Sequence, residues 1–160
     1  MNQILNISCY KFVALPDAED LRQPCLDQAL ARGLKGTILI AEEGINFFLA
    51  GPAAEVHAFV DWLRQDPRFS DLMPKESWSA AQPFRKMLVK VKREIIRMNH
   101  PSIRPAAGRA PAVTPETAKR WLDQGHDDEG RPVVTLDTRN QFEVDAGTFK
   151  NTINWGITKF

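Results

Sequence analysis

The side chains best suited to chemistry by type and spacing are cations that cluster between residues 85 and 110. This stretch carries eight basic side chains and one acidic one, a net charge of +7, whereas residues 1–84 carry −4 and residues 111–160 carry −2. Cations on one surface bind phosphates and release counterions, so binding weakens as salt rises. An edge strand protected by lysines against aggregation is an equal alternative. The phosphate-binding candidates are Arg85, Lys86, Lys90, Lys92, Arg93 and Arg97.

The two cysteines are predicted to be ordinary buried thiols. Cys9 and Cys25 form no CxxC pair, and no histidine lies at metal-ligand spacing from either. A reactive thiol needs an exposed, electropositive setting that lowers its pKa, and neither neighbourhood supplies a cluster of cations. The sequence therefore predicts neither a metal site nor a catalytic cysteine within these 160 residues.

A pair of adjacent carboxylates, Glu42 and Glu43, precedes Gly44. Paired carboxylates can serve acid–base or metal chemistry when they share a site. Neighbouring residues of a strand point to opposite faces, however, so a shared site is not expected here. We interpret the pair as forming a turn or a contact between domains.

The elements that must position these residues follow from the spacing of apolar side chains. Alternation and β-branched residues predict strands, and three-to-four spacing predicts helices; Pro24 implies a kink or a late start in the first helix. The order indicates an α+β, ferredoxin-like domain (strand-helix-strand-strand-helix-strand) over residues 1–98, with two helices on one face of an antiparallel sheet. The expected strands cover 4–13, 37–41, 46–50 and 86–92, with a short extended piece at 75–78, and the expected helices cover 17–32 and 52–65.

The remainder of the chain has a different composition. Residues 99–113 contain three prolines and Gly108, which is typical of an extended interdomain linker. Thr114 and Pro115 then start a helix, and an apolar strand at 133–136 delivers Asp137, Thr138 and Arg139 to its carboxyl end. Residues 114–160 are therefore expected to form a second unit.

Several short strings resemble the rhodanese-like tRNA uridine hydroxylases of bacteria, which oxidise the wobble uridine of tRNA to 5-hydroxyuridine. The most specific string is AEEGIN at 41–46 in the first unit, and the second unit carries DTRN at 137–140. Typical members follow Asn46 with small residues, whereas this chain has Phe47 and Phe48. The motif positions carried over are Glu43, Gly44, Asn46, Asp137 and Arg139.

The resemblance implies that residues 114–160 are the first part of an α/β rhodanese-like domain. In that family Asp137 and Arg139 would organise the start of the domain by hydrogen bonding; the alternative is that Asp137 caps the following helix and Arg139 makes a surface pair. The family's catalytic cysteine lies in a CxGGxR loop, which is expected beyond Phe160. Such a part of a domain is expected to fold poorly, with exposed apolar residues at Val133, Val134, Phe142 and Phe149.

The function implied by the resemblance is oxygen-dependent hydroxylation of tRNA in the cytoplasm, with molecular oxygen as co-substrate and no other cofactor seen. The partner would be tRNA, and DNA is not expected as a partner. A membrane is not expected either, because no apolar run reaches about 20 residues. The isolated chain is expected to be inactive. Tyr10, Trp78 or Phe84 could stack on bases, although buried aromatics are commoner. The alternatives are a rhodanese-type sulfurtransferase and a non-enzymatic interaction module.

Overall fold

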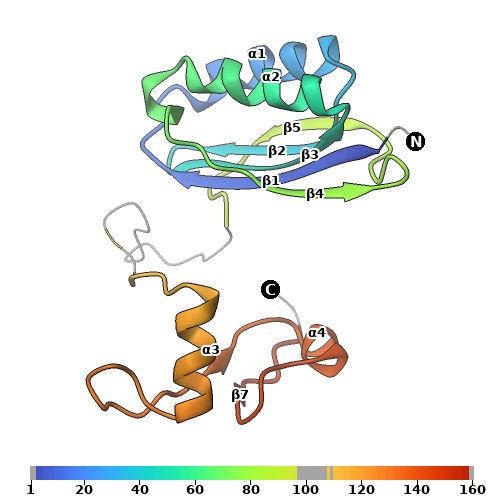
Figure 1. Ribbon diagram of the computed structural model, residues 1–160. Coiled ribbons are helices and arrows are strands. Elements are labelled where there is room, and N and C mark those ends of the chain that lie inside the picture. Colours follow the sequence, from blue (N-terminus) through green and yellow to red (C-terminus); the bar gives the residue numbers. More distant parts are fainter. Residues whose placement is uncertain (1–2, 97–107, 109, 159–160) are drawn as a thin grey trace. The chain divides into compact units, whose positions relative to one another are not determined.

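The computed structural model describes residues 3–96, 108 and 110–158 and divides the chain into two units, residues 1–109 and 110–160 (Figure 1). Most of the expected linker at 99–113, together with Arg97, lies outside the described residues. The predicted domain boundaries at 98 and 114 therefore stay predictions.

The first unit is a five-stranded sheet with two helices, α1 and α2, over one of its faces (Figure 1). This arrangement confirms the predicted α+β, ferredoxin-like class, and the strands lie in the order β4-β1-β3-β2-β5. The elements are β1 (Ile4–Phe12), α1 (Ala18–Ala31), β2 (Lys35–Ala41), β3 (Gly44–Gly51), α2 (Ala53–Arg64), a 3-10 turn (Pro67–Phe69), β4 (Lys75–Ser79) and β5 (Met87–Val91).

The sequence predicted that the strand at 86–92 would be the last strand of the ferredoxin-like motif, and this is wrong. The last strand of the motif is β4, and β5 is a fifth strand added at the other edge of the sheet. β4 pairs antiparallel with β1, placing Ser79 opposite Ile4. β5 instead runs parallel to β2 at the other edge, placing Met87 opposite Gly36. Almost all of β4 is exposed, so its sequence lacks the apolar alternation that made the later stretch look like the closing strand.

The core lies between the sheet and the two helices. In β1 the odd-numbered residues Leu5, Ile7 and Cys9 are buried, whereas the even-numbered residues point to the other side, which we call the helix-free face. From α2, Phe59 is completely buried beside three other apolar residues. Burial of each such large side chain contributes about 1.5–3 kcal/mol.

The first helix runs through a proline. α1 begins at Ala18 and continues past Pro24, so the alternative of a late start is wrong. Pro24 is exposed, and Cys25 and Ala29 form the buried side of the helix. Proline removes one backbone hydrogen bond from the helix. Packing of the buried side against the sheet therefore stabilises the helix at this point.

Strands β2 and β3 form a hairpin, linked by Glu42 and Glu43 alone, so the interpretation of this pair as a turn is confirmed. Gly44 starts β3 with φ of +150°, and a Cβ atom there would lie 2.0 Å from the carbonyl oxygen of Lys11. Gly44 pairs with Phe12 of β1, so the two backbones approach at a point where only hydrogen fits.

The second unit holds four short elements: α3 (Pro115–Gln124), β6 (Leu136–Asp137), α4 (Gln141–Ala146) and β7 (Ile153–Asn154). Thr114 caps α3 through its side chain, as predicted, and Gly125 ends it in the left-handed conformation. The strand expected at 133–136 is reduced to Leu136–Asp137, parallel to β7. Val134, Phe142 and Phe149 are exposed, and no described layer covers this short sheet in the way that parallel strands require.

Among the described ranges, no helix combines the length and apolar composition that crossing a bilayer requires.

Replacing Gly44 by alanine should lower the free energy of unfolding by about 3 kcal/mol, because the new methyl group meets a backbone oxygen at a position of positive φ. Gly33→Ala is the matched control, since Gly33 also has positive φ (+62°) but has no atom within 4 Å of its Cβ position. That control should cost about 1 kcal/mol. Urea denaturation followed by circular dichroism measures both, and equal losses would contradict the close approach.

Candidate functional site

The AEEGIN string holds the chain where it leaves the sheet. The Glu43 carboxylate accepts a hydrogen bond from the backbone N–H of Ile95 (2.7 Å), and the Asn46 amide donates to the Ile95 carbonyl oxygen (3.5 Å). Ile95 itself is 3% exposed. The structure thus brings Glu43 and Asn46, which flank Gly44, together as a clamp on Ile95, whereas Glu42 lines a separate hollow.

The basic candidates separate into two groups. Lys86 and Lys90 are exposed at alternate positions of β5 and its approach, on the helix-free face, and Arg85 is exposed just before them. Lys92 and Arg93 instead line a hollow together with four carboxylates. Those carboxylates belong to Asp17, Glu19, Asp20 and Glu42. Of the three lysines predicted to share one face, Lys92 therefore lies beside these carboxylates. Lys86 and Lys90 do not line the hollow.

Of the three aromatics considered for stacking, two are well exposed. Tyr10 is 49% and Trp78 is 53% exposed, whereas Phe84 is half-buried. Sequence reasoning missed Phe48, which is 51% exposed on β3. The sequence did offer one indication of this: Phe48 lies two residues after Asn46, so both side chains are on the same face of the strand.

Both cysteines are buried. Cys9 faces the helices with 8% exposure and Cys25 is 1% exposed in α1. Burial raises the pKa of the Cys9 thiol above its usual value and raises that of Cys25 to about 12. Neither can serve as a thiolate nucleophile near neutral pH. Within the described part of the chain, no group of histidine, cysteine and carboxylate side chains could hold a metal ion.

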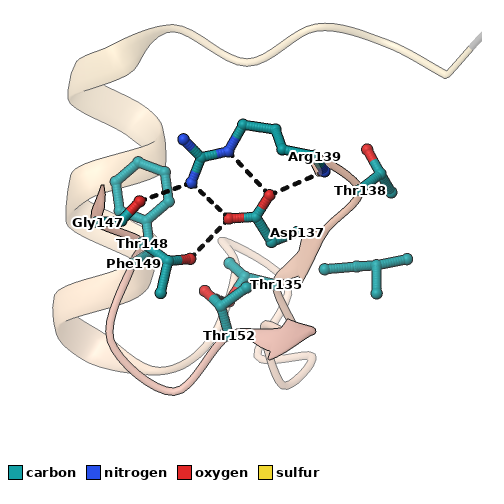
Figure 2. A pocket seen from close by; sticks show the side chains of 9 residues that line it. Thr135, Asp137, Thr138, Arg139, Gly147, Thr148, Phe149 and Thr152 are labelled. Atoms are coloured by element: carbon teal, nitrogen blue, oxygen red, sulfur yellow. Dashed lines mark hydrogen bonds and ion pairs between the residues drawn. The ribbon is translucent and has the colours of Figure 1, made fainter. Parts of the chain in front are cut away.

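In the second unit, Asp137 and Arg139 form a closed network with the loop at 147–148 (Figure 2). Asp137 accepts from the backbone N–H and Nε of Arg139 (3.1 and 2.9 Å) and from its terminal nitrogen (2.6 Å). The same carboxylate accepts from the Thr148 hydroxyl (2.7 Å), and Arg139 also donates to the Gly147 carbonyl oxygen (2.7 Å). The end of β6 is thereby tied to the loop that follows α4.

This network determines the electrostatics of the pair. Hydrogen bonds from Arg139 and then Thr148 hold the pKa of Asp137 well below its usual range, and Asp137 in turn raises the pKa of Arg139. Asp137 is therefore ionised and fully engaged near neutral pH, which suits a positioning group and not a proton acceptor. It does not cap α4: Asn140 occupies the cap, and its backbone N–H donates to the Glu143 carboxylate (3.1 Å).

The network forms one wall of a hollow of about 620 Å³, lined also by Thr135, Thr152 and Phe149. The hydroxyls of Thr135 and Thr152 are 2.8 Å apart and join the two parallel strands. The charges in its wall compensate each other, and the hollow presents mainly hydroxyl and apolar groups. Its arrangement organises a loop, and neither described cysteine lines it.

Asp137→Asn should loosen the loop at 147–149, because the amide replaces an acceptor with a donor facing Arg139. Amide hydrogen exchange at Thr148 should become at least tenfold faster, while Asp123→Asn, which alters only an exposed pair with Lys119 (2.6 Å), should leave it unchanged. Since the folded pKa of Asp137 is depressed, its contribution is complete above the unfolded value of about 3.9 and is lost as pH falls below it. Protection that is independent of pH between 5 and 2 would contradict this role.

The native chain should react slowly with Ellman's reagent at pH 8. A thiol with a pKa of about 12 is thiolate on the order of a thousandfold less often than a free cysteine, and both thiols are also shielded by packing. In guanidinium both thiols should react at once, and Cys25→Ser should halve that amplitude. Rapid modification of one thiol in the folded chain would show that burial does not control its reactivity.

Three similar proteins share one name. A protein named tRNA uridine(34) hydroxylase from Delftia acidovorans is 74% identical over 160 residues, which are 100% of this chain and 61% of that protein. Proteins of the same name from Variovorax paradoxus and Bordetella pertussis are 65% and 59% identical, again over 100% of this chain and over 61% and 66% of theirs. The chain thus spans about three fifths of the length of these relatives.

Solved structures add only a weak likeness. An acylphosphatase from Coxiella burnetii matches with a TM-score of 0.39 and 11% identity, over 56% of this chain and 94% of that one. The BLUF protein BlrB in its dark state matches with a TM-score of 0.48 and 18% identity, over 57% of this chain and 74% of that one.

The family described as the UPF0176 acylphosphatase like domain matches residues 4–95, which include every strand and helix of the first unit and end at the residue clamped by Glu43 and Asn46. The resemblance found in the motifs and the fold derived from the strand order agree with this match. The chain belongs to this family, and relatives that match it over its full length are named tRNA uridine(34) hydroxylase.

Proposed function

We propose that the whole protein to which this chain corresponds is an oxidoreductase that hydroxylates the wobble uridine of tRNA. The observation that carries the proposal is the 74% identity, over the full chain, to a protein named tRNA uridine(34) hydroxylase. The product would be 5-hydroxyuridine, with the added oxygen supplied by molecular oxygen. The place of action would be the cytoplasm, where the substrate tRNA is found.

The geometry supports a division of tasks within this protein. The first unit presents exposed lysines at positions 86 and 90 with no described ion-pair partner, which suits binding of a polyanion. The second unit holds the Asp137–Arg139 network, which shapes a loop but supplies no reactive group. Both cysteines are buried, so the reactive cysteine of the proposed reaction would lie outside residues 1–160. The isolated chain would therefore bind tRNA without modifying it.

Deletion of the full-length gene should remove 5-hydroxyuridine from position 34 of the affected tRNAs, measured by mass spectrometry of tRNA nucleosides. The full-length gene supplied on a plasmid should restore it, and a plasmid encoding residues 1–160 should not. Unchanged 5-hydroxyuridine in the deletion strain, when no second enzyme makes it, would overturn the proposal. A thiosulfate-to-cyanide assay on the whole protein separates this reaction from sulfur transfer.

Replacing Lys86 and Lys90 together by alanine should weaken tRNA binding about tenfold at 0.1 M salt, and the slope of log affinity against log salt should fall by about 1 for each lysine. Lys119→Ala is the control, because that ammonium is already paired with Asp123 (2.6 Å). Filter binding at several salt concentrations measures both variants. An unchanged slope in the double variant would mean that these lysines do not meet phosphates.

A further inference from the structure

The helix-free face of the first sheet carries two exposed aromatic rings on two of its three inner strands. Tyr10 lies on β1 and Phe48 on β3, and these strands are neighbours in the middle of the sheet. Tyr10 pairs with Asn46, and Phe48 pairs with Ser8, so each ring occupies its own row across the sheet. The two rings are diagonal neighbours, on the order of 7 Å apart by the usual spacing of a sheet.

Both rings are exposed to solvent, whereas the other residues of their strands are buried or half-buried. Tyr10 is 49% and Phe48 is 51% exposed, while Phe47 on the opposite face is completely buried. The helices α1 and α2 lie over the other side of the sheet (Figure 1). Near Asn46 the backbone of Ile95 reaches the helix-free face, so this segment borders the row of Tyr10, and Phe48 lies in the next row.

The charged residues at the outer ends of the two rows are lysines. Continuing the rows outward, Lys90 is aligned with Tyr10 through Asn46 and Leu39, and Lys75 is aligned with Phe48 through Ser8. None of the described carboxylates forms an ion pair with Lys75, Lys86 or Lys90. The one acidic residue of β4, Glu76, belongs to the opposite face, where it hydrogen-bonds to His57 (3.0 Å).

Rings on inner strands with cations on outer strands fit one type of ligand. Unpaired bases stack on exposed aromatic side chains, and their phosphates reach lysines at the edges, whereas bases inside a duplex are not available for stacking. A purely apolar partner would leave the lysines uncompensated, and it would also cover the polar residues Ser8 and Asn46, which lie opposite the rings. Charge complementarity therefore favours single-stranded RNA over a protein surface.

We propose that the helix-free face binds unpaired nucleotides of RNA, with Tyr10 and Phe48 each stacking on one base and Lys75, Lys86 and Lys90 meeting the phosphates. This inference deepens the proposed function and rests on it for the identity of the RNA: the face would hold unpaired nucleotides of the tRNA loop that contains uridine 34. Stacking accepts every base, so the face recognises the unpaired state more than the sequence.

The test measures binding of a fluorescein-labelled anticodon stem-loop to the whole protein by anisotropy. Tyr10→Ala and Phe48→Ala should each weaken binding about tenfold, and Tyr10→Phe should retain it. Trp78→Ala is the matched control, because Trp78 is an equally exposed aromatic (53%) of the same sheet that shares the face of Leu5. A fully paired RNA of the same length should bind more weakly and respond little to the ring substitutions.

Normal binding by the Tyr10→Ala, Phe48→Ala double variant, or an equal loss in Trp78→Ala, would overturn the inference, provided that circular dichroism shows each variant folded. Loss of self-association in the double variant with RNA binding unchanged would also overturn it, since a second copy would then cover the face. Hydroxylation is followed separately. If the wild-type protein never forms 5-hydroxyuridine but the double variant loses RNA binding, the RNA-binding face stands and the proposed reaction is wrong. If the double variant binds RNA normally and forms 5-hydroxyuridine at the wild-type rate, the proposed reaction stands and the RNA-binding face is wrong.

Discussion

Antiparallel pairing of β1 with β3 is the constraint on which the first unit depends. Eight consecutive residue pairs run from Leu5 with Gly51 to Phe12 with Gly44, and this register fixes the face of every later residue in the sheet. A shift of one residue would move Leu5, Ile7 and Cys9 away from the helices and expose them. Because the helices bury only one face, the same register that builds the core also places Tyr10 and Phe48 together in solvent.

The AEEGIN string connects this register to the end of the sheet. Gly44 allows the close approach of β3 to β1, and Glu43 and Asn46, on either side of it, hold the backbone of Ile95. One short segment thus sets a turn, a backbone contact and the point where the chain leaves the sheet. Its carboxylate serves as a hydrogen-bond acceptor for a backbone N–H, which explains an acidic residue there without acid–base chemistry.

Sequence alone predicted the elements whose burial produces a period, and it failed where burial does not. The strands at 4–13 and 86–92 alternate because one side of each packs on the core. β4 is an exposed edge strand, so the sequence Lys75–Ser79 has no apolar alternation that would identify it as the last strand of the motif. Phe48 was missed for a related reason: an aromatic residue in an apolar strand is expected to be buried, and only the register to β1 shows that it is not. In the second unit, Thr114 predicted its helix, but the Asp137 network joins residues 11 positions apart and needed the structure.

The second unit and the helix-free face of the first unit differ in how their cations are paired. In the second unit the arginines are paired with carboxylates close in sequence, Arg139 with Asp137 (2.6 Å) and Arg131 with Asp127 (2.6 Å), so their charges organise local loops. On the helix-free face of the first unit, Lys75 and Lys90 lack such partners among the described residues. Unpaired surface cations are screened within about 10 Å at 0.1 M salt, so alone they would bind any polyanion weakly. Aromatic stacking is not screened in this way, and it requires bases that are already unstacked. The lysines would attract any RNA through its phosphates, and the aromatic rings would bind only unstacked bases. Together they would distinguish an RNA loop from a duplex independently of the base sequence.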